Sequence, residues 1–221
     1  MPASVCVVYY SGFKGATARL SERLAHGAQS VPGTTTRLIR VEDIDDAWEA
    51  LHAADAIVFG SPTYVGSVAA RFKEFIEMCA GQVWLERLWL NKLAGGFTTS
   101  AGRSGDKLNC LQDLTIFAAQ MGMIWVPMRI VGGNYSTYGS ENDLNRMAGY
   151  LGVMAQANID QPAELAPPES DLATAEIHGH HIATIAAQLA VGRAAVPASY
   201  IVERESETPQ GRPRSLLEIG Q

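Results

Sequence analysis

VCVVYYSGFKGAT, at residues 5–17, is the stretch that decides the fold. A run of apolar and partly β-branched residues stops at Ser11, and a loop that contains Gly12 and Gly15 follows. Between residues 16 and 29, apolar side chains then recur at helical spacing. This pattern predicts a β-strand, a short glycine-containing loop and an α-helix.

The loop of residues 11–17 has the features of a phosphate site. A helix start offers unpaired backbone N–H groups and the positive end of its dipole, and glycines let a phosphate come close. Ser11 and Thr17 add hydroxyl donors. The loop is neither a Walker loop nor a Gly-x-Gly-x-x-Gly fingerprint. An ordinary strand-to-helix turn therefore stays open as the alternative until other stretches decide.

Length and composition indicate one soluble globular domain. Seventeen basic and 23 acidic residues among 221 give a formal net charge of -6, and no basic stripe occurs. We therefore expect no nucleic-acid partner. The N-terminus lacks a signal-peptide pattern and no window has the length of a membrane span, so we expect a cytoplasmic protein without a membrane span.

Neither the cysteines nor the histidines favour a metal site. Cys6, Cys79 and Cys110 are widely separated and form no Cys-x-x-Cys pair, which is typical of reduced, mostly buried thiols. The histidine-rich stretch at residues 176–181 lies on the last expected helix, far along the chain from the loops. We interpret it as a helix surface rather than as a ligand set.

Strands and helices alternate along the chain, which predicts a parallel sheet covered by helices on both sides. Further strands are expected at residues 35–41, 56–60, 92–99 and 123–131, and further helices at 47–54, 68–79, 107–121 and 171–192. Arg37 and Arg40 place the second strand at an edge of the sheet. Residues 132–170 are expected to form an irregular excursion with one short helix at 141–152.

Two side chains are expected to cap helices, Ser67 before residue 68 and Asp106 before residue 107. The acidic turn at residues 42–46 is expected to cap the helix at 47–54. The main domain is expected to span residues 1–192. The polar tail at 193–221 is expected to be disordered or to pack on a partner subunit.

Three loops rich in Gly, Ser and Thr follow expected strands, at residues 11–17, 61–67 and 98–106. The carboxyl ends of parallel strands meet at one edge of a sheet, and ligands bind there where the strand order reverses. We therefore expect the three loops to form one site.

The chemistry of these loops favours a cofactor over a catalytic side chain. They contain no His, and their one carboxylate is Asp106. No serine has a neighbouring base, so a hydrolase is not favoured and no catalytic residue is predicted. A site with one phosphate position, hydroxyls and aromatic surface suits flavin mononucleotide (FMN), which brings its own redox chemistry.

Three segments carry a family resemblance: YYSGFKGAT at 9–17, FGSPTYVGS at 59–67 and FTTSAG at 97–102. They resemble the flavodoxin-like family, and within it the WrbA branch of NAD(P)H:quinone oxidoreductases. The likeness spans residues 4–190 in order, and PTYVGS followed by FKEF at 72–75 is its most specific part. It implies a three-layer, doubly wound α/β fold with a five-stranded parallel sheet in the order 2-1-3-4-5.

The resemblance implies that FMN binds at all three loops. The matched cofactor-binding residues are Ser11, Gly12, Phe13, Lys14, Gly15, Ala16, Thr17, Pro62, Thr63, Tyr64, Val65, Gly66, Ser67, Thr99, Ser100, Ala101, Gly102, Arg103 and Ser104. The matched substrate-side residues are Phe13, Trp84 and Gln120. In that family a neighbouring subunit completes the site, which implies a homo-oligomer, a dimer or a tetramer.

Several residues depart from the family pattern. Gln120 stands where the family has one of a pair of histidines, and it cannot carry a charge. Arg103 replaces a glycine, Val65 replaces an aromatic residue over the flavin ring, and Lys14 is an insertion beside the phosphate. These changes could alter substrate choice or weaken flavin binding.

The implied activity is transfer of two electrons from NAD(P)H through FMN to a quinone-like acceptor. A one-electron carrier of the flavodoxin type is one alternative, and a flavin-binding regulatory or interaction protein is another. The residues leave open whether NADH or NADPH is the donor and whether quinones, azo compounds or nitro compounds are the acceptors.

Overall fold

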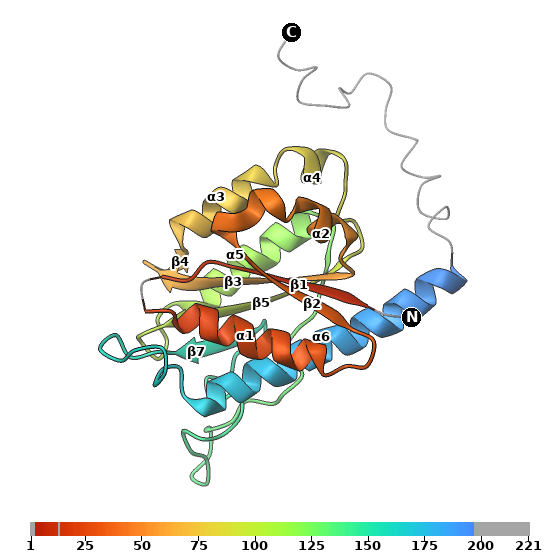
Figure 1. The fold of residues 1–221 in the computed structure, drawn as a ribbon. Helices are drawn as coiled ribbons and strands as arrows, with labels where there is room; N and C mark the ends of the chain where they lie inside the picture. The colour runs from red at the N-terminus through yellow and green to blue at the C-terminus, as the bar shows by residue number, and fades with distance from the viewer. Residues whose placement is uncertain (1–2, 13, 197–221) are drawn as a thin grey trace.

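The computed structural model describes residues 3–12 and 14–196. Phe13 and the tail at 197–221, for which roles are predicted above, lie outside the described residues. A sheet stands between two layers of helices (Figure 1). The strands are β1 (Ser4–Tyr9), β2 (Thr35–Arg40), β3 (Ala56–Tyr64), β4 (Ser67–Val68), β5 (Leu93–Ser100), β6 (Ile124–Trp125) and β7 (Val153–Gln156).

The helices lie on the two faces of this sheet (Figure 1). They are α1 (Ala16–Gln29), the 3₁₀ helix η1 (Val41–Asp46), α2 (Trp48–Ala53), α3 (Ala70–Met78), α4 (Gln82–Leu85), α5 (Lys107–Gln120) and α6 (Glu169–Ala195). α1 and α6 cover one face, and α2, α3 and α5 cover the other.

The strand order is β2-β1-β3-β5-β6, and β7 also pairs with β5. β1, β2, β3, β5, β6 and β7 run parallel, and β4 pairs antiparallel with β3. The predicted three-layer flavodoxin-like fold is confirmed. β2 lies at an edge as expected, and most of its residues are exposed because one side of that strand has no neighbour.

The two faces of the sheet are packed differently. Beneath α3 and α5, Phe59 contacts Phe117 with ring centroids 5.1 Å apart, in a cluster with Phe72, Phe75 and Trp89. On the other face α1 and α6 touch through glycines. A Cβ on Gly27 would lie 1.8 Å from the Glu176 carbonyl oxygen, and one on Gly179 would lie 1.9 Å from the Leu24 carbonyl oxygen. Only glycine permits so close a contact between the helices.

The strand predicted at residues 123–131 is wrong in extent. β6 ends at Trp125, and the Val126 N–H donates to the Ala94 oxygen 2.8 Å away. Pro127 has no N–H to continue the ladder, and the chain leaves the sheet there. The second half of β5 pairs instead with β7, from the predicted irregular excursion, with Phe97 opposite Val153. Two separate segments thus share the fifth position of the sheet.

The short helix predicted at residues 141–152 does not form. Asn145 (φ 46°) and Ala148 (φ 51°) both adopt left-handed backbone conformations. The Asn145 side chain donates to the carbonyl oxygens of Ile130 and Gly149, and its amide oxygen accepts the Gly149 N–H. These local bonds replace helical ones, as asparagine side chains often do.

The predicted caps are also corrected. Ser67 lies in β4 and donates to Asp113, while α3 begins after Ala69, whose N–H donates to the Ser61 hydroxyl oxygen at 2.9 Å. Asp106 precedes α5 in a left-handed conformation (φ 54°) and makes no side-chain capping bond.

Helix bounds differ from the predictions near several ends. The acidic turn at 42–46 forms η1 rather than a cap for α2, and the helix expected from residue 68 begins at Ala70. α6 extends two residues earlier and three residues later than expected, to Ala195. Most of the predicted tail lies outside the described residues.

The three cysteines are free and buried, as predicted. Burial raises the pKa of the Cys6 thiol to about 11, which keeps it protonated at neutral pH. Within the described residues, no helix has both the length and the apolar character required to span a membrane.

His178 is a polar side chain buried in the core without hydrogen bonds among the described residues. It is fully buried on α6, and neither ring nitrogen has a hydrogen-bond partner among the described residues. Burial, followed by the neighbouring His181, lowers the pKa of His178 to about 3. The folded protein therefore holds this imidazole neutral over the physiological range.

Replacing His178 by leucine should weaken the acid sensitivity of the fold. The unfolded chain takes up a proton near pH 6.5 and the folded chain only near pH 3, so this group lowers stability as the pH falls below 6.5. Between pH 7 and roughly pH 5 the wild type should lose about 2 kcal/mol more than H178L. Urea unfolding across that range measures the difference.

Ile182, fully buried on the same helix, supplies the control for this prediction. I182V should lower the free energy of unfolding by a similar amount at every pH, since neither side chain can take up a proton. Parallel pH profiles for the wild type and H178L would contradict the role given to His178.

Candidate functional site

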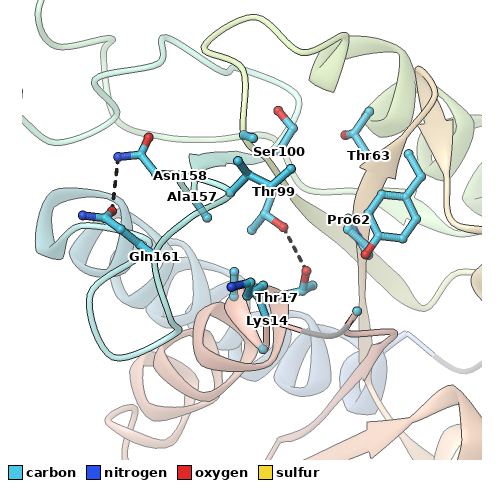
Figure 2. Close-up of a pocket in the computed structure, with 15 residues that line it drawn as sticks. Lys14, Thr17, Pro62, Thr63, Thr99, Ser100, Ala157, Asn158 and Gln161 are labelled. Carbon is cyan, nitrogen blue, oxygen red and sulfur yellow. Dashed lines mark hydrogen bonds between the residues drawn. The ribbon is translucent and has the colours of Figure 1, made fainter.

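A cavity of about 330 Å³ lies at the carboxyl ends of β1, β3 and β5. It is lined by Gly12, Lys14, Gly15, Ala16, Thr17, Pro62, Thr63, Tyr64, Thr99, Ser100, Ala101, Ala157, Asn158, Ile159 and Gln161. Figure 2 shows Lys14 and Thr17 on one side, Pro62 and Thr63 on a second, and Thr99 and Ser100 on a third. The structure thus brings residues of all three loops together.

Other predicted site residues do not line the cavity within this chain. From the three loops these are Ser11, Val65, Gly66, Ser67, Gly102, Arg103 and Ser104. Trp84 lies half-exposed on α4. Gln120 ends α5, about 20 Å along that helix from its start at the third loop. Phe13 lies outside the described residues.

The start of α1 faces the cavity with its backbone donors. Gly15 (φ 74°) precedes the helix and makes no side-chain cap. The Ala18 N–H donates to the Ser11 hydroxyl oxygen at 3.1 Å. The N–H groups of Ala16 and Thr17 have no acceptor among the described residues, and both residues line the cavity. A helix start of this kind binds anions through its free N–H groups and its dipole.

Two hydroxyl pairs connect the loops beneath the cavity. The Oγ1 atoms of Thr17 and Thr99 lie 2.9 Å apart, and those of Thr63 and Thr98 lie 2.7 Å apart. Either hydroxyl of each pair can donate, so the pair can offer a ligand a donor or an acceptor. All four side chains are buried, which fixes the spacing of the three loops.

Tyr64 forms an aromatic wall of the cavity, and Val65 does not. Val65 (φ 50°) and Gly66 (φ 85°) form the two-residue turn between β3 and β4, and Val65 is fully exposed. The Tyr64 hydroxyl lies so close to Gly12 that an added Cβ there would be 1.9 Å away. Burial raises the pKa of the Tyr64 phenol, which stays neutral.

The cavity wall at residues 157–161 was missed by the sequence analysis. The Ala157 N–H donates to the Ser100 oxygen at 3.0 Å, and the Asn158 amide nitrogen donates to Gln161 Oε1 at 3.2 Å (Figure 2). These two amides extend the polar lining. A strand predicted at β7 would have placed the residues after it at this edge of the sheet, but β7 was not expected.

Lys107, at the start of α5, was also missed. It is 1% exposed, and its ammonium donates to the Ser100 hydroxyl oxygen, which belongs to a cavity-lining residue. Burial lowers the pKa of Lys107 to about 8. A lysine at the first position of a helix gives no sequence signal of burial, because most lysines are exposed.

A chain of charged side chains joins the third loop to the excursion. Arg103 pairs with Glu141 at 2.7 Å, Glu141 also pairs with Arg146, and Arg146 forms a bidentate pair with Asp171 at 2.8 Å. Arg103 lowers the pKa of the Glu141 carboxyl. Asp171 in turn accepts the Gln156 N–H at 2.9 Å, at the end of β7. Arg103 therefore contacts the excursion rather than the cavity.

Comparisons with known proteins agree with this geometry. A family model described as NADPH-dependent FMN reductase matches residues 34–136. The flavodoxin FldP of Pseudomonas aeruginosa is 36% identical over 187 residues, which cover 83% of this chain and 96% of that protein. The crystal structure of a WrbA-like flavodoxin from Agrobacterium tumefaciens is 36% identical, with a TM-score of 0.64, over 84% of this chain and 98% of that one.

The chain belongs to the WrbA-type branch of the flavodoxin-like family. The predicted family is thereby confirmed. An NAD(P)H dehydrogenase (quinone) of Geobacter sulfurreducens is 29% identical over 208 residues, which cover 84% of this chain and 98% of that protein. The family model includes the second and third loops of this WrbA-type chain and begins after the first.

Ser11→Ala should destabilise the fold before any ligand is present. The substitution removes the acceptor of the Ala18 N–H in the first turn of α1, and losing such a cap costs about 1 kcal/mol. Urea unfolding of the ligand-free protein measures the change. Ser104→Ala is the matched control, since Ser104 is exposed. Equal stabilities of S11A and S104A would rule out the capping role.

Proposed function

We propose that this protein is an FMN-dependent oxidoreductase that takes two electrons from NAD(P)H and passes them to a quinone-like acceptor. The observation that carries the proposal is the cavity in which the open start of α1, buried hydroxyls and an aromatic wall meet. Family membership supports it, as do the printed functions of the NADPH-dependent FMN reductase model and the NAD(P)H dehydrogenase (quinone) relatives.

The described residues fit FMN in size and in charge. A cavity of about 330 Å³ is in the range of small-molecule sites. None of the described residues that line it carries a carboxylate, and Lys14 contributes a positive charge within the first loop. The N–H groups of Ala16 and Thr17 and the Thr17 hydroxyl would hold the phosphate.

The remaining walls suit a flat ring with a polar edge. Pro62, Thr63 and Tyr64 would lie along the ring, and Thr99 to Ala101 would lie near its polar edge. Bound FMN would accept a hydride from NAD(P)H and release the electron pair to the acceptor. The chain's own residues would bind and orient the two substrates in turn.

Catalysis here needs no acid or base from the cavity. The described lining residues include no His, Asp or Glu. The proposal therefore assigns no catalytic side chain. The predicted roles of Phe13, Trp84 and Gln120 toward the substrate stay proposals. Trp84 and Gln120 would serve a cavity in a neighbouring copy, so this part of the proposal requires a homo-oligomer.

A one-electron carrier is the second candidate. The 36% identical relative from Pseudomonas aeruginosa is named a flavodoxin. A carrier would exchange electrons with protein partners and would not be reduced rapidly by a free nicotinamide nucleotide.

Thr17→Val should weaken FMN binding about tenfold and change riboflavin binding little. The variant keeps the side-chain volume but removes a hydroxyl beside the helix start, and bonds to charged groups contribute about 1.5–3 kcal/mol. Quenching of flavin fluorescence measures both affinities. Thr99→Val breaks the same hydroxyl pair from β5, and it should not discriminate between the two flavins. Equal losses for FMN and riboflavin in T17V would refute the phosphate position.

Anaerobic stopped-flow absorbance tests the reaction itself. The FMN-loaded protein should lose its visible flavin absorbance rapidly on mixing with NADH or NADPH, because the nucleotide reduces the ring. Benzoquinone should then restore the absorbance. A flavin that stays oxidised with both nucleotides would favour the carrier. A protein that binds no FMN would overturn both candidates.

A further inference from the structure

The ammonium of Lys107 is the centre of the third loop. Its nitrogen donates to the Ser100 hydroxyl oxygen at 2.8 Å, to the Gly102 carbonyl oxygen at 2.6 Å and to the Arg103 carbonyl oxygen at 2.8 Å. An ammonium has three donors, and all three are used. The Ser100 hydroxyl donates in turn to the Gly102 oxygen at 3.0 Å. The loop therefore wraps around a buried cation.

This arrangement also orients the opposite side of the loop. A trans peptide directs its C=O and N–H groups in opposite directions. Because the carbonyls of Gly102 and Arg103 point at the ammonium, the N–H groups of Arg103 and Ser104 point away from it. Neither N–H has an acceptor among the described residues. The loop thus presents two free donors on the side away from Lys107.

The charge of Lys107 has no direct counter-ion. Among the described residues it forms no ion pair, and its three acceptors are uncharged oxygens. Asp171 on α6 raises its pKa, and Arg146 of the excursion lowers it. Asp171 is already engaged in its bidentate pair with Arg146, and Arg103 of the loop pairs with Glu141. The Lys107 ammonium therefore lies one hydrogen bond behind the cavity wall, at Ser100.

We propose that Lys107 is a positioning residue of the cofactor site that holds the third loop in shape and favours the reduced, more negative form of FMN. The inference rests on the proposed function, since it requires FMN in the cavity. Hydride transfer adds two electrons and one proton to oxidised FMN, so the reduced cofactor carries one additional negative charge. A cation behind the loop stabilises that charge more than it stabilises the oxidised ring.

Lys107→Met tests the proposal, because methionine keeps most of the length of the side chain and removes the charge. K107M should bind reduced FMN about tenfold more weakly, relative to oxidised FMN, than the wild type does. For a two-electron couple this equals a potential about 30 mV lower. Redox titration of the bound flavin measures the potential, and fluorescence quenching measures the affinity for oxidised FMN.

Lys92→Met is the matched control. Lys92 precedes β5, at the end of the strand opposite to Ser100. It is a partly buried lysine that, like Lys107, donates to carbonyl oxygens, those of His52 and Ala54. Burial lowers its pKa as well. K92M should lose stability and keep the wild-type potential. A purely structural role of Lys107 would weaken oxidised and reduced FMN equally and leave the potential of K107M unchanged.

The dependence on pH gives a second readout. The difference in potential between the wild type and K107M should be largest below the Lys107 pKa of about 8 and should close above it, as the amine loses its proton. The charged groups that act on Lys107 from the elements packed against it are Asp171 of α6 and Arg146 of the excursion.

A measurement on the wild type keeps the test valid if K107M does not fold. Linkage is reciprocal. Reduction of FMN must therefore lower the acid dissociation constant of Lys107 by the same factor by which the Lys107 proton favours reduction, which raises the Lys107 pKa. NMR of ¹³C-labelled lysine should show a rise of about one pH unit on reduction. An unchanged Lys107 pKa on reduction, or an unchanged potential in K107M, would overturn the proposed role of Lys107 and leave the proposed function intact. If the wild type binds no FMN, both the proposed function and the role of Lys107 are overturned.

Discussion

The parallel pairing of β1, β3 and β5 is the constraint on which the rest of the structure depends. Tyr9 pairs with Gly60, and Gly60 pairs with Phe97, so the three central strands reach the same edge in register. Three loops far apart in the chain are thereby brought to one cavity. Gly60 is required at this point, because a Cβ there would lie 2.0 Å from the Phe97 ring. The strand edge, rather than any single loop, creates the site.

Features encoded by local sequence could be predicted. The buried runs at residues 5–9 and 56–60 are central strands, and Arg37 and Arg40 correctly indicated an edge strand. The glycine-containing loop before α1 was also evident, because Gly15 needs a positive φ. These patterns depend on periodicity and turn chemistry within about ten residues, which a sequence displays directly.

Features that depend on distant contacts could not be predicted. β7 is a four-residue strand whose stability comes from pairing with β5, whose paired residues lie 56 positions earlier. Asn145 stops a helix through bonds to Ile130 and Gly149. Lys107 is buried because the loop before it supplies three oxygen acceptors. Trp84 and Gln120 illustrate the same limit for contacts between subunits, because neither residue lines the cavity of its own chain.

The division of the fifth sheet position between β6 and β7 has an evolutionary consequence. β6 pairs with the first half of β5 and β7 with the second half, and 27 residues separate Trp125 from Val153 by position. The outer part of the connecting segment, at residues 135–140, is mostly exposed and can change in length or sequence without shifting either pairing. Lineages of this architecture could therefore acquire new outer surfaces there, while the amide-bearing wall that follows β7 keeps its place beside the ligand.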